Sequence, residues 1–197
     1  MGKPAMVVSA TISTSPTMVY FGQEVGEPGN ENAGYGIATR TSIYDYVGVP
    51  NHQKWMNKGK FDGGQLADDQ KDLRDFYKRL LNFTIKSNAL MGNYKEIHSY
   101  NRSQSKNYNH RLFSFVRWST TEKLIIISNF DAKESFDLEL KLPTEIIKEW
   151  DLKSGNYNLV DQLYGILKAD LKIENGEGIV KFKIAPLASY IFKVQNN

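Results

Sequence analysis

Hydrophobic and polar residues alternate over much of the second half of the chain. Residues 136–141 read Phe-Asp-Leu-Glu-Leu-Lys, and residues 180–184 read Val-Lys-Phe-Lys-Ile. A period of two puts the apolar side chains on one face of a strand and the polar side chains on the other. Residues 124–127, Leu-Ile-Ile-Ile, are apolar on both faces, which predicts a central strand. The pattern therefore predicts half-buried antiparallel strands around a strand that is buried on both sides.

Further apolar runs and a turn complete this β-rich part. Strands are expected at residues 112–118, 157–163, 167–173 and 190–194. Asn175 and Gly176 suit the positive φ angles of a tight hairpin turn. From residue 94 onward we expect only strands and turns, about seven to eight short strands in all, and this spacing is typical of an antiparallel β-sandwich.

The first half of the chain follows a helical period instead. Between residues 73 and 84, apolar residues recur at the three-and-four spacing of one buried helix face. Asp68 and Asp69 precede this run and can cap the helix. A shorter helix is expected from Pro4 to about residue 14, because proline suits the first turn of a helix. These two segments are the predicted helices of the chain.

Between the predicted helices lie a short apolar run and a long glycine-rich region. Pro16 ends the first helix, and the apolar run at residues 17–21 predicts a buried strand that ends by presenting polar residues to a loop. Residues 22–64 contain many glycines, but their tyrosines, tryptophan and phenylalanine argue against disorder. A loop of that length in a compact domain is usually functional.

Composition excludes several classes of partner. The chain has 25 basic and 22 acidic residues, and a net charge of +3 this evenly spread is not a nucleic-acid footprint. No apolar run approaches the roughly 18 residues of a membrane span. There is no cysteine, and the three histidines lack ligand spacing. We therefore expect neither nucleic acid nor a membrane as a partner, and neither a metal ion nor another cofactor.

Residues 15–26 carry a resemblance to a known family. They read Ser-Pro-Thr-Met-Val-Tyr-Phe-Gly-Gln-Glu-Val-Gly, which resembles the eighth barrel strand of the α-amylase family of glycoside hydrolases. Residues 39–46 resemble the segment after that strand, and residues 69–83 resemble the last barrel helix. Residues 88–94 resemble the exit into a C-terminal β-domain. Ser15 stands where the family usually has glycine, which we expect to alter only the turn.

The resemblance continues through the β-rich part. Residues 112–118, 124–130 and 184–190 resemble strands of family members, and the pair Asn129-Phe130 is the most characteristic. The implied fold is α+β, with a partial (β/α) barrel remnant followed by an antiparallel β-sandwich domain. The remnant, at residues 1–90, consists of a helix, strand eight, a long loop and the last helix, and the β-domain occupies residues 91–197.

The resemblance implies an activity and also its absence from this chain. The resemblance implies that this chain is the C-terminal fragment of an α-amylase-like glycoside hydrolase. The whole enzyme would act on α-glucosidic linkages in starch-like or malto-oligosaccharide substrates. Family members use an aspartate nucleophile, a glutamate acid/base and a second aspartate on strands four, five and seven of the barrel. No Asp or Glu here matches those motifs, so we assign no catalytic residue. We expect this chain alone to be inactive. In the longer protein we expect an α-glucan as the substrate and the missing N-terminal barrel as the partner.

Glu24 and Glu27 are the nearest substitutes for a catalytic pair. A retaining glycosidase needs two carboxyl groups about 5 Å apart. Carboxylates at the end of a strand are more often paired and hydrogen-bonded for structural reasons, and we favour that interpretation.

Position along a barrel strand still indicates a substrate cleft. Active sites of barrel enzymes lie at the C-terminal ends of the strands, so Gln23, Glu24, Arg40, Tyr44 and Asp45 are expected to line or border the cleft in the longer protein. Arg40 with the Tyr44-Asp45 pair can shape that cleft by ion pairing and sugar stacking. Equally, Arg40 can serve only to hold the long loop in place.

Two alternatives stay open. The chain can be a non-catalytic carbohydrate-binding or packing module, with Tyr46, Trp55, Trp118 or Trp150 as sugar-stacking platforms, although the position of Trp118 at the end of an apolar strand favours a core role. Alternatively, barrel surface left uncovered can pair two copies of the chain. That surface would comprise Met6, Val7, Ile12, Val19 and Phe21.

Overall fold

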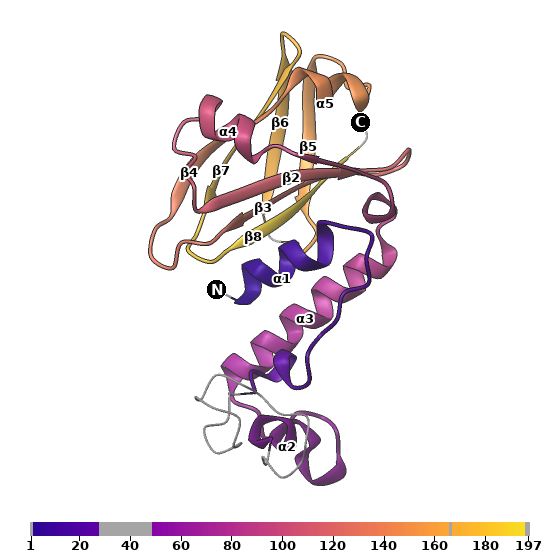
Figure 1. Cartoon of the computed structure of the whole chain (residues 1–197), viewed down its shortest axis with the longest axis vertical. Helices are drawn as coiled ribbons and strands as arrows, with labels where there is room; N and C mark the ends of the chain where they lie inside the picture. The colour runs from indigo at the N-terminus through magenta and orange to yellow at the C-terminus, as the bar shows by residue number, and fades with distance from the viewer. Residues whose placement is uncertain (1, 28–48, 166, 196–197) are drawn as a thin grey trace. The chain divides into compact units, whose positions relative to one another are not determined.

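A computed structural model describes residues 2–27, 49–165 and 167–195 of the chain (Figure 1). Its contacts form two compact units. The β-unit comprises Met1–Pro16 with Leu80–Asn197, and the turn-helix unit comprises Thr17–Arg79. The first helix thus packs with the strands, whereas the sequence places it with the barrel part. The predicted division at residue 90 into a barrel remnant and a β-domain stays a prediction.

The described part of the β-unit contains one eight-stranded antiparallel sheet. Its strands pair in the order β1-β2-β3-β8-β5-β6-β7-β4, so β4 lies at the opposite edge from β1. The strands are β1 Asn93–Glu96, β2 Leu112–Trp118, β3 Lys123–Asn129, β4 Phe136–Leu142, β5 Gly155–Asp161, β6 Lys168–Glu174, β7 Glu177–Ile184 and β8 Ser189–Val194. The predicted antiparallel β-domain is confirmed. It differs from a two-sheet sandwich because β8 pairs with both β3 and β5, which makes the sheet continuous.

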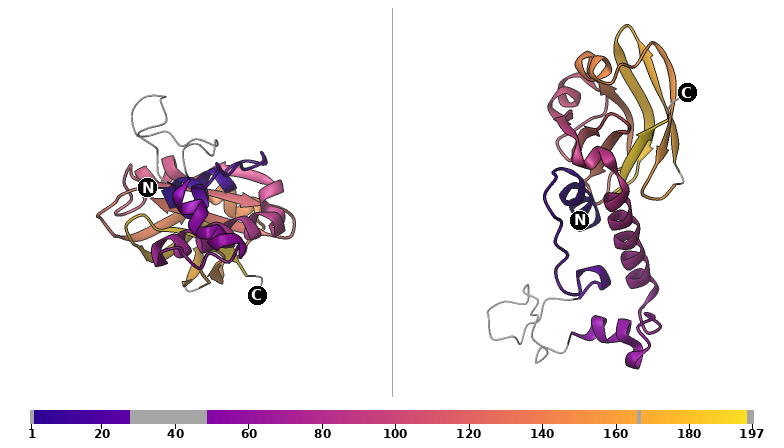
Figure 2. Two further views of the ribbon diagram at one scale, coloured as in Figure 1. Left: turned by 90° about the horizontal axis from the view of Figure 1, so that it is seen from below. Right: turned by 90° about the vertical axis from the view of Figure 1, so that its right-hand side faces the viewer.

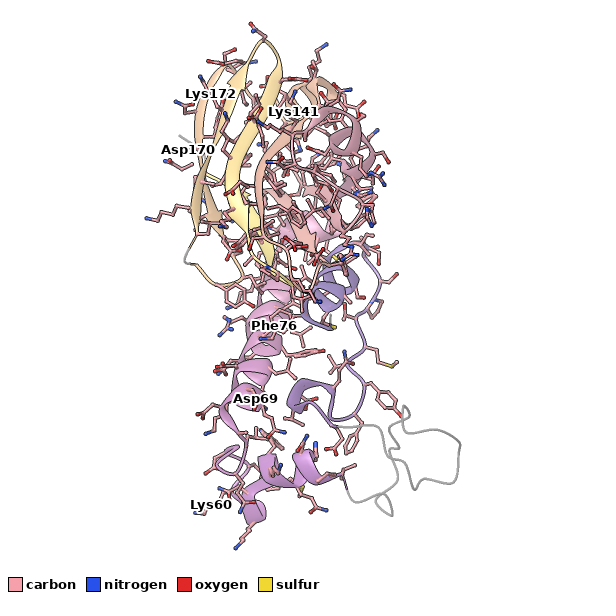
Figure 3. The ribbon with its side chains drawn as sticks, turned by 90° about the vertical axis from the view of Figure 1, so that its left-hand side faces the viewer. Lys60, Asp69, Phe76, Lys141, Asp170 and Lys172 are labelled. Carbon is pink, nitrogen blue, oxygen red and sulfur yellow. The ribbon has the colours of Figure 1, made fainter. Side chains whose placement is uncertain are left out.

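The sheet curls around one core. Figure 1 shows β2 and β3 running across the direction of β6 and β7, and the second view of Figure 2 shows these two parts of the sheet facing each other. Ile125 of β3, Leu140 of β4 and Val180 of β7 are fully buried members of the same core cluster. On β6, Asp170 and Lys172 point to solvent while the intervening Leu171 is buried (Figure 3). The alternation read from the sequence therefore separates core from surface.

Helix α1 explains why β3 is apolar on both faces. Ile125 and Ile127 belong to the core cluster, and the alternate residues Leu124 and Ile126 are equally buried on the other face. Helix α1 (Gly2–Thr11) contacts β3 and β8 and covers the sheet there (Figure 1).

The same helix removes part of the expected self-association surface. Met6 and Val7 of α1 are 5% and 0% exposed, and Ile12 just beyond it is partly buried. These side chains are covered within the β-unit, so they do not form the exposed apolar surface that the sequence suggested. Val19 and Phe21 are partly buried.

Two short helices correct the expectation that the chain contains only strands and turns after residue 94. They are α4 (His98–Gln104) and α5 (Thr144–Glu149), and each is too short to produce a readable helical period. Asn101 of α4 is fully buried, and its amide exchanges two hydrogen bonds with the backbone of Lys141 on edge strand β4. Helix α4 thereby satisfies backbone groups that an edge strand would otherwise leave unpaired.

The turn-helix unit contains η1 (Gln23–Val25), α2 (Pro50–Met56), η3 (Asn57–Gly59) and the larger part of α3. Helix α3 (Asp68–Lys86) confirms the helix predicted from the three-and-four spacing. Phe76 on this helix is buried, whereas Asp69 is exposed (Figure 3). In the part of the chain that the structure describes, no helix is long and apolar enough to cross a membrane.

The apolar run at residues 17–21 does not form the predicted strand. A strand needs a neighbour to receive its backbone hydrogen bonds, and no described strand pairs with this run. Instead, the backbone carbonyl of Tyr20 accepts the Gln23 N–H at 2.9 Å, which starts a turn. Met18 is consequently 82% exposed.

Candidate functional site

The Gln23–Glu27 turn follows the apolar run and carries the predicted cleft residues. Gly22 and Gly26 lie on either side of η1 with φ angles of 74° and 68°, values that glycine adopts without strain. A Cβ atom on Gly22 would lie 2.6 Å from the Cβ of Glu27. Glycine at position 22 is therefore what allows the turn to close onto Glu27.

Gln23 uses its side chain to fix this turn against α3. Its Oε1 accepts the Tyr20 N–H at 3.0 Å, and its Nε2 donates to the Tyr77 hydroxyl at 2.7 Å. Burial raises the pKa of Tyr77, the hydrogen bond from Gln23 lowers it and the charge of Glu24 raises it further, with an upward shift overall. The phenol therefore stays protonated at neutral pH. Gln23 lies on the predicted turn, but its amide is engaged in structure.

Glu27 caps helix α2. Its Oε2 accepts the backbone N–H groups of Asn51 at 3.0 Å and His52 at 2.9 Å. Asn51 returns a hydrogen bond from its Nδ2 to the carbonyl of Gly26 at 2.8 Å. These N–H groups have no partner within a helix and are satisfied here by a carboxylate some 25 residues away in sequence. Glu27 thus has a structural role, as favoured from the sequence.

Glu24 differs from its neighbours in the turn. It is partly buried, and its charge contributes to the raised pKa of Tyr77. No hydrogen bond or ion pair holds its carboxylate within the described residues. Among the described residues Glu24 thus differs from Glu27, whose carboxylate accepts two backbone N–H groups.

A row of aromatic rings borders the turn. Phe21 and His52 have ring centroids 4.6 Å apart, His52 and Trp55 5.6 Å, and Trp55 and Phe61 5.8 Å. The guanidinium of Arg74 lies 4.9 Å from the centre of the Trp55 ring, a cation–π contact that holds the ring in place. Trp55, proposed from the sequence as a stacking platform, is partly exposed within this row.

The remaining predicted cleft residues, Arg40, Tyr44 and Asp45, lie outside the described residues, as does Tyr46. The structure thus brings Gln23 and Glu24 together on one turn, and the other three positions stay predictions. Within the described ranges, no group of three His, Cys, Asp or Glu side chains could hold a metal ion.

Asn129, the most characteristic residue of the β-rich motifs, is structural. It is fully buried, and its Nδ2 donates to the carbonyls of Glu134 and Ala185, both at 2.9 Å. Its Oδ1 accepts the Asp131 N–H at 2.9 Å. The side chain therefore joins the β3–β4 and β7–β8 connections, and both N–H groups of its amide are used in doing so.

Two buried charges hold the segment at residues 87–92 against strands of the β-unit. Arg117 is 2% exposed and donates to the carbonyls of Ile12, Leu90 and Gly92. Glu122 accepts hydrogen bonds from the Ser87 hydroxyl at 2.6 Å and the Ala89 N–H at 3.0 Å.

The surroundings of Glu122 also set its ionisation. Burial alone raises the pKa of this carboxyl, but the hydrogen bonds from Ala89 and Ser87 together with Lys193 outweigh it and lower the pKa below the ordinary value. The Lys193 Nζ lies 3.0 Å from the Glu122 Oε1. Glu122 is therefore a charged structural anchor.

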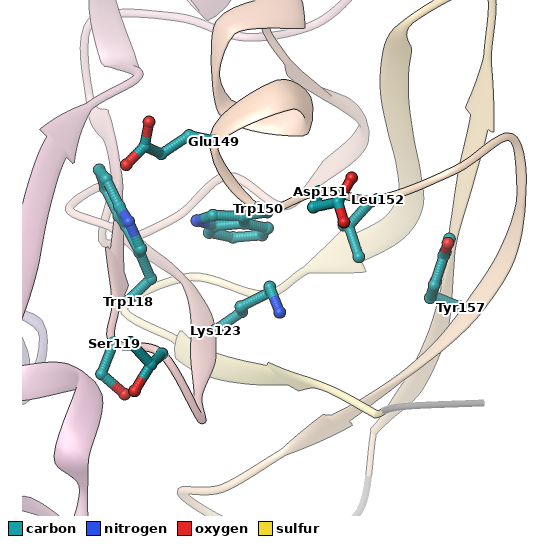
Figure 4. A pocket seen from close by; sticks show the side chains of 9 residues that line it. Trp118, Ser119, Lys123, Glu149, Trp150, Asp151, Leu152 and Tyr157 are labelled. Atoms are coloured by element: carbon teal, nitrogen blue, oxygen red, sulfur yellow. The ribbon is translucent and has the colours of Figure 1, made fainter.

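Trp118 and Trp150 meet in a hollow of the β-unit (Figure 4). Their ring centroids are 6.3 Å apart, and the rings meet edge to face. Trp118 packs against the core, as favoured from the sequence, but also lines the hollow, whereas Trp150 is only 3% exposed. Sequence reasoning missed this pair because it joins the end of β2 to the end of α5, which are distant along the chain.

Comparison with family models gives a match over the β-rich part. Residues 102–195 match the family model described as alpha amylase, C-terminal all-beta domain. Comparison with curated proteins gave no match.

Several solved structures share the fold. An AmyP variant in complex with maltotriose is 19% identical, with 98% of this chain and 34% of that chain covered and a TM-score of 0.60. A maltogenic alpha-amylase, AmyB from Thermotoga neapolitana, is 11% identical over 99% of this chain and 36% of that chain, with a TM-score of 0.62. The trehalulose synthase MutB from Pseudomonas mesoacidophila MX-45 is 14% identical over 98% and 38%, with a TM-score of 0.51.

Identities this low show similarity of fold alone. The chain spans about a third of the length of the solved structures that it matches.

Proposed function

We propose that this chain, whose residues 102–195 match the alpha amylase C-terminal all-beta domain, is the C-terminal part of a glycoside hydrolase that acts on α-glucosidic linkages of starch-like or malto-oligosaccharide substrates. The domain match carries the proposal. The order of the motifs before it supports the same assignment, because residues 15–26, 69–83 and 88–94 follow one another as a barrel strand, a barrel helix and a domain exit do in that family.

Within this function, the chain contributes a wall of the substrate cleft and no catalytic carboxylate. Retaining hydrolysis needs two carboxyl groups about 5 Å apart across the sugar. Glu27 is unsuited to that role because its carboxylate already accepts two backbone N–H groups. We assign Glu24, together with Arg40, Tyr44 and Asp45, to substrate contact, and Gln23 to holding the turn. The N-terminal barrel is then the partner that supplies the catalytic groups.

A comparison of two purified proteins tests this assignment. The first is this chain, and the second is the same chain extended upstream to include a full barrel. With soluble starch, we expect the extended protein to release reducing sugar and this chain to remain at the rate of the buffer. Replacing Glu24 with Gln in the extended protein should lower kcat/KM by roughly tenfold, since a charged hydrogen bond to substrate is worth about 1.5 kcal/mol.

Two results would contradict the proposal. An extended protein with no activity on any α-glucan would remove the assigned function. Hydrolysis by this chain alone at a rate comparable to the extended protein would show that its own carboxylates suffice.

A packing module without a role in the cleft is the second candidate. The buried networks around Asn129, Arg117 and Glu122 favour it, because all three side chains serve to hold segments of the β-unit together. In that case Glu24→Gln would leave kcat/KM unchanged while Asn129→Ala lowered stability.

A further inference from the structure

A hollow of about 580 Å³ lies on the β-unit, and its lining includes none of the predicted cleft residues. It is formed by the end of β2, the β2–β3 connection, the end of α5 and strand β5 (Figure 4). The residues that matter for ligand binding are Trp118, Lys123, Glu149, Trp150, Asp151 and Tyr157. The lining combines aromatic side chains with charged and hydroxyl groups, and the volume lies in the range of small-molecule sites.

The aromatic walls of the hollow are held in place before any ligand arrives. Trp150 is 3% exposed and meets Trp118 edge to face. The Tyr157 hydroxyl accepts the Lys153 N–H at 3.0 Å and donates to the Lys153 carbonyl at 3.1 Å, which fixes the direction of its ring. Rigid aromatic side chains lose little conformational entropy when a ligand binds. The hollow is therefore preorganised.

One polar group at the base of the hollow has no partner. The Nε1 of Trp150 is buried and has no hydrogen-bond acceptor in the part of the chain that the structure describes. Its nitrogen-bearing edge points toward the Trp118 side of the hollow (Figure 4). A buried donor without an acceptor is uncommon in proteins. An oxygen atom of a bound molecule would satisfy it.

The charges around the hollow select for a neutral ligand. Asp151 is paired with Lys153 at 2.6 Å, whereas Glu149 and Lys123 have no ion-pair partner among the described residues. An anion would meet the carboxylates of Glu149 and Asp151, and a cation would meet Lys123. A cation would also leave the Trp150 N–H without an acceptor. A neutral molecule with hydroxyl groups can instead bond to a carboxylate, an ammonium group and an indole N–H together.

We propose that the hollow binds a glucosyl ring of an α-glucan chain. The apolar face of the sugar stacks on Trp118, one hydroxyl oxygen accepts the N–H of Trp150, and other hydroxyls bond to Glu149 and Lys123. The aromatic side chains and the polar groups of both charges suit a sugar ring, and the choice of an α-glucan rests on the proposed function. The β-unit would thereby hold the polysaccharide independently of the cleft.

Calorimetric titration of the purified chain with maltoheptaose tests the site. We expect saturable binding, with Trp118→Ala weakening the affinity at least about tenfold through loss of the stacking face. Trp150→Phe keeps a ring but removes the N–H, and we expect a loss of about fivefold. Tyr164→Ala is the matched control, because Tyr164 is an exposed aromatic residue of the same unit outside the hollow. This variant should bind maltoheptaose as tightly as the unaltered chain does. Thermal unfolding of each variant verifies that it is folded.

Three results would overturn the proposal. The first is a lack of saturable binding of maltoheptaose by the unaltered chain. The second is unchanged affinity in folded Trp118→Ala and Trp150→Phe. The third is saturation by cellohexaose alone, which would remove the α-glucan assignment of the hollow. Starch hydrolysis by the extended protein is measured separately, so failure of the hollow and failure of the proposed function are distinguishable.

Discussion

A short apolar run in each unit was predicted to form a strand, and only the run in the β-unit does so. In the β-unit, residues 124–127 form a strand with partners on both sides, and Ile126 is 0% exposed. In the turn-helix unit, residues 17–21 form no strand, and Met18 is 82% exposed. The difference is the presence of neighbours that can complete a sheet. An apolar run predicts the tendency to form a strand, but the surrounding chain decides whether one forms.

The units also differ in what their polar motif residues do. Asn129, Arg117 and Glu122 of the β-unit are buried and bonded within it. In the turn-helix unit, Gln23 and Glu27 are likewise bonded, but Glu24 is not held by any described hydrogen bond. Substitutions in each unit test this difference.

The largest effect is expected from Asn129→Ala in the β-unit. The change leaves two carbonyls and the buried N–H of Asp131 without their partner, which should lower the free energy of unfolding by about 3 kcal/mol. Chemical denaturation measures it. Asn158→Ala, at an exposed position of β5, is the control and should change stability by less than about 0.5 kcal/mol. Equal effects of the two variants would show that Asn129 does not anchor the β-unit.

A smaller and local effect is expected from Glu27→Ala in the turn-helix unit. Loss of the carboxylate removes the cap of α2 and should cost about 1 kcal/mol. Hydrogen exchange should show faster exchange at the amides of Asn51 and His52, with little change in β3. Glu24→Ala is the matched control and should leave these amides protected. Protection that survives Glu27→Ala would mean that the cap is not important for α2.

The pH dependence of stability should report on Glu122. Because the pKa of Glu122 is lowered in the folded chain, its contribution to stability is present above its ordinary value of 4.5 and is lost as the pH falls through the folded value. Asp161 acts in the opposite direction: burial raises its pKa against the effect of backbone hydrogen bonds. Its contribution is therefore present below its ordinary value of 3.8 and is lost as the pH rises through the folded value.

Glu122→Gln separates these contributions. The variant should be less stable than the unaltered chain at pH 7, and the difference should shrink as the pH falls below 4.5. Urea denaturation at several pH values measures the difference. A difference that stays constant from pH 7 to pH 3 would contradict the lowered pKa. The pKa of Asp131 is also lowered, by backbone N–H groups of Lys133 and Glu134 and by Arg111, so some acid sensitivity should remain in the variant.

The sequence predicted the β-unit well because its signal is local. Alternation fixed the position of strands such as β4 and β7, and Asn175 and Gly176, with φ angles of 52° and 81°, form the expected hairpin turn. Helices α4 and α5 were not predicted because six or seven residues give no readable helical period. The role of Asn101 depends on a bond to Lys141, 40 residues away, which no local pattern contains.

The candidate sites depend even more on distant contacts. The motif in residues 15–26 predicted Gln23 and Glu24 at the end of a strand, whereas the structure places them on a turn with no strand before it. The capping role of Glu27 required Asn51 and His52, which a sequence pattern does not connect with it. The hollow is lined by residues of β2, the end of α5 and β5, which are far apart in the sequence. The sequence around Trp118 or Trp150 therefore could not show that these two side chains share a hollow.

The smallest change in the stability of this chain is expected from Met18→Ser. In this chain the side chain is 82% exposed, so the free energy of unfolding should change by less than about 0.5 kcal/mol. In the extended protein, the resemblance places the same residue in a buried barrel strand, where losing a buried methionine side chain costs about 2 kcal/mol or more. Denaturation of both proteins with and without the substitution measures the two costs. A loss of about 2 kcal/mol in this chain would show that residues 17–21 are already packed here, whereas a negligible loss in the extended protein would show that the run does not become a barrel strand.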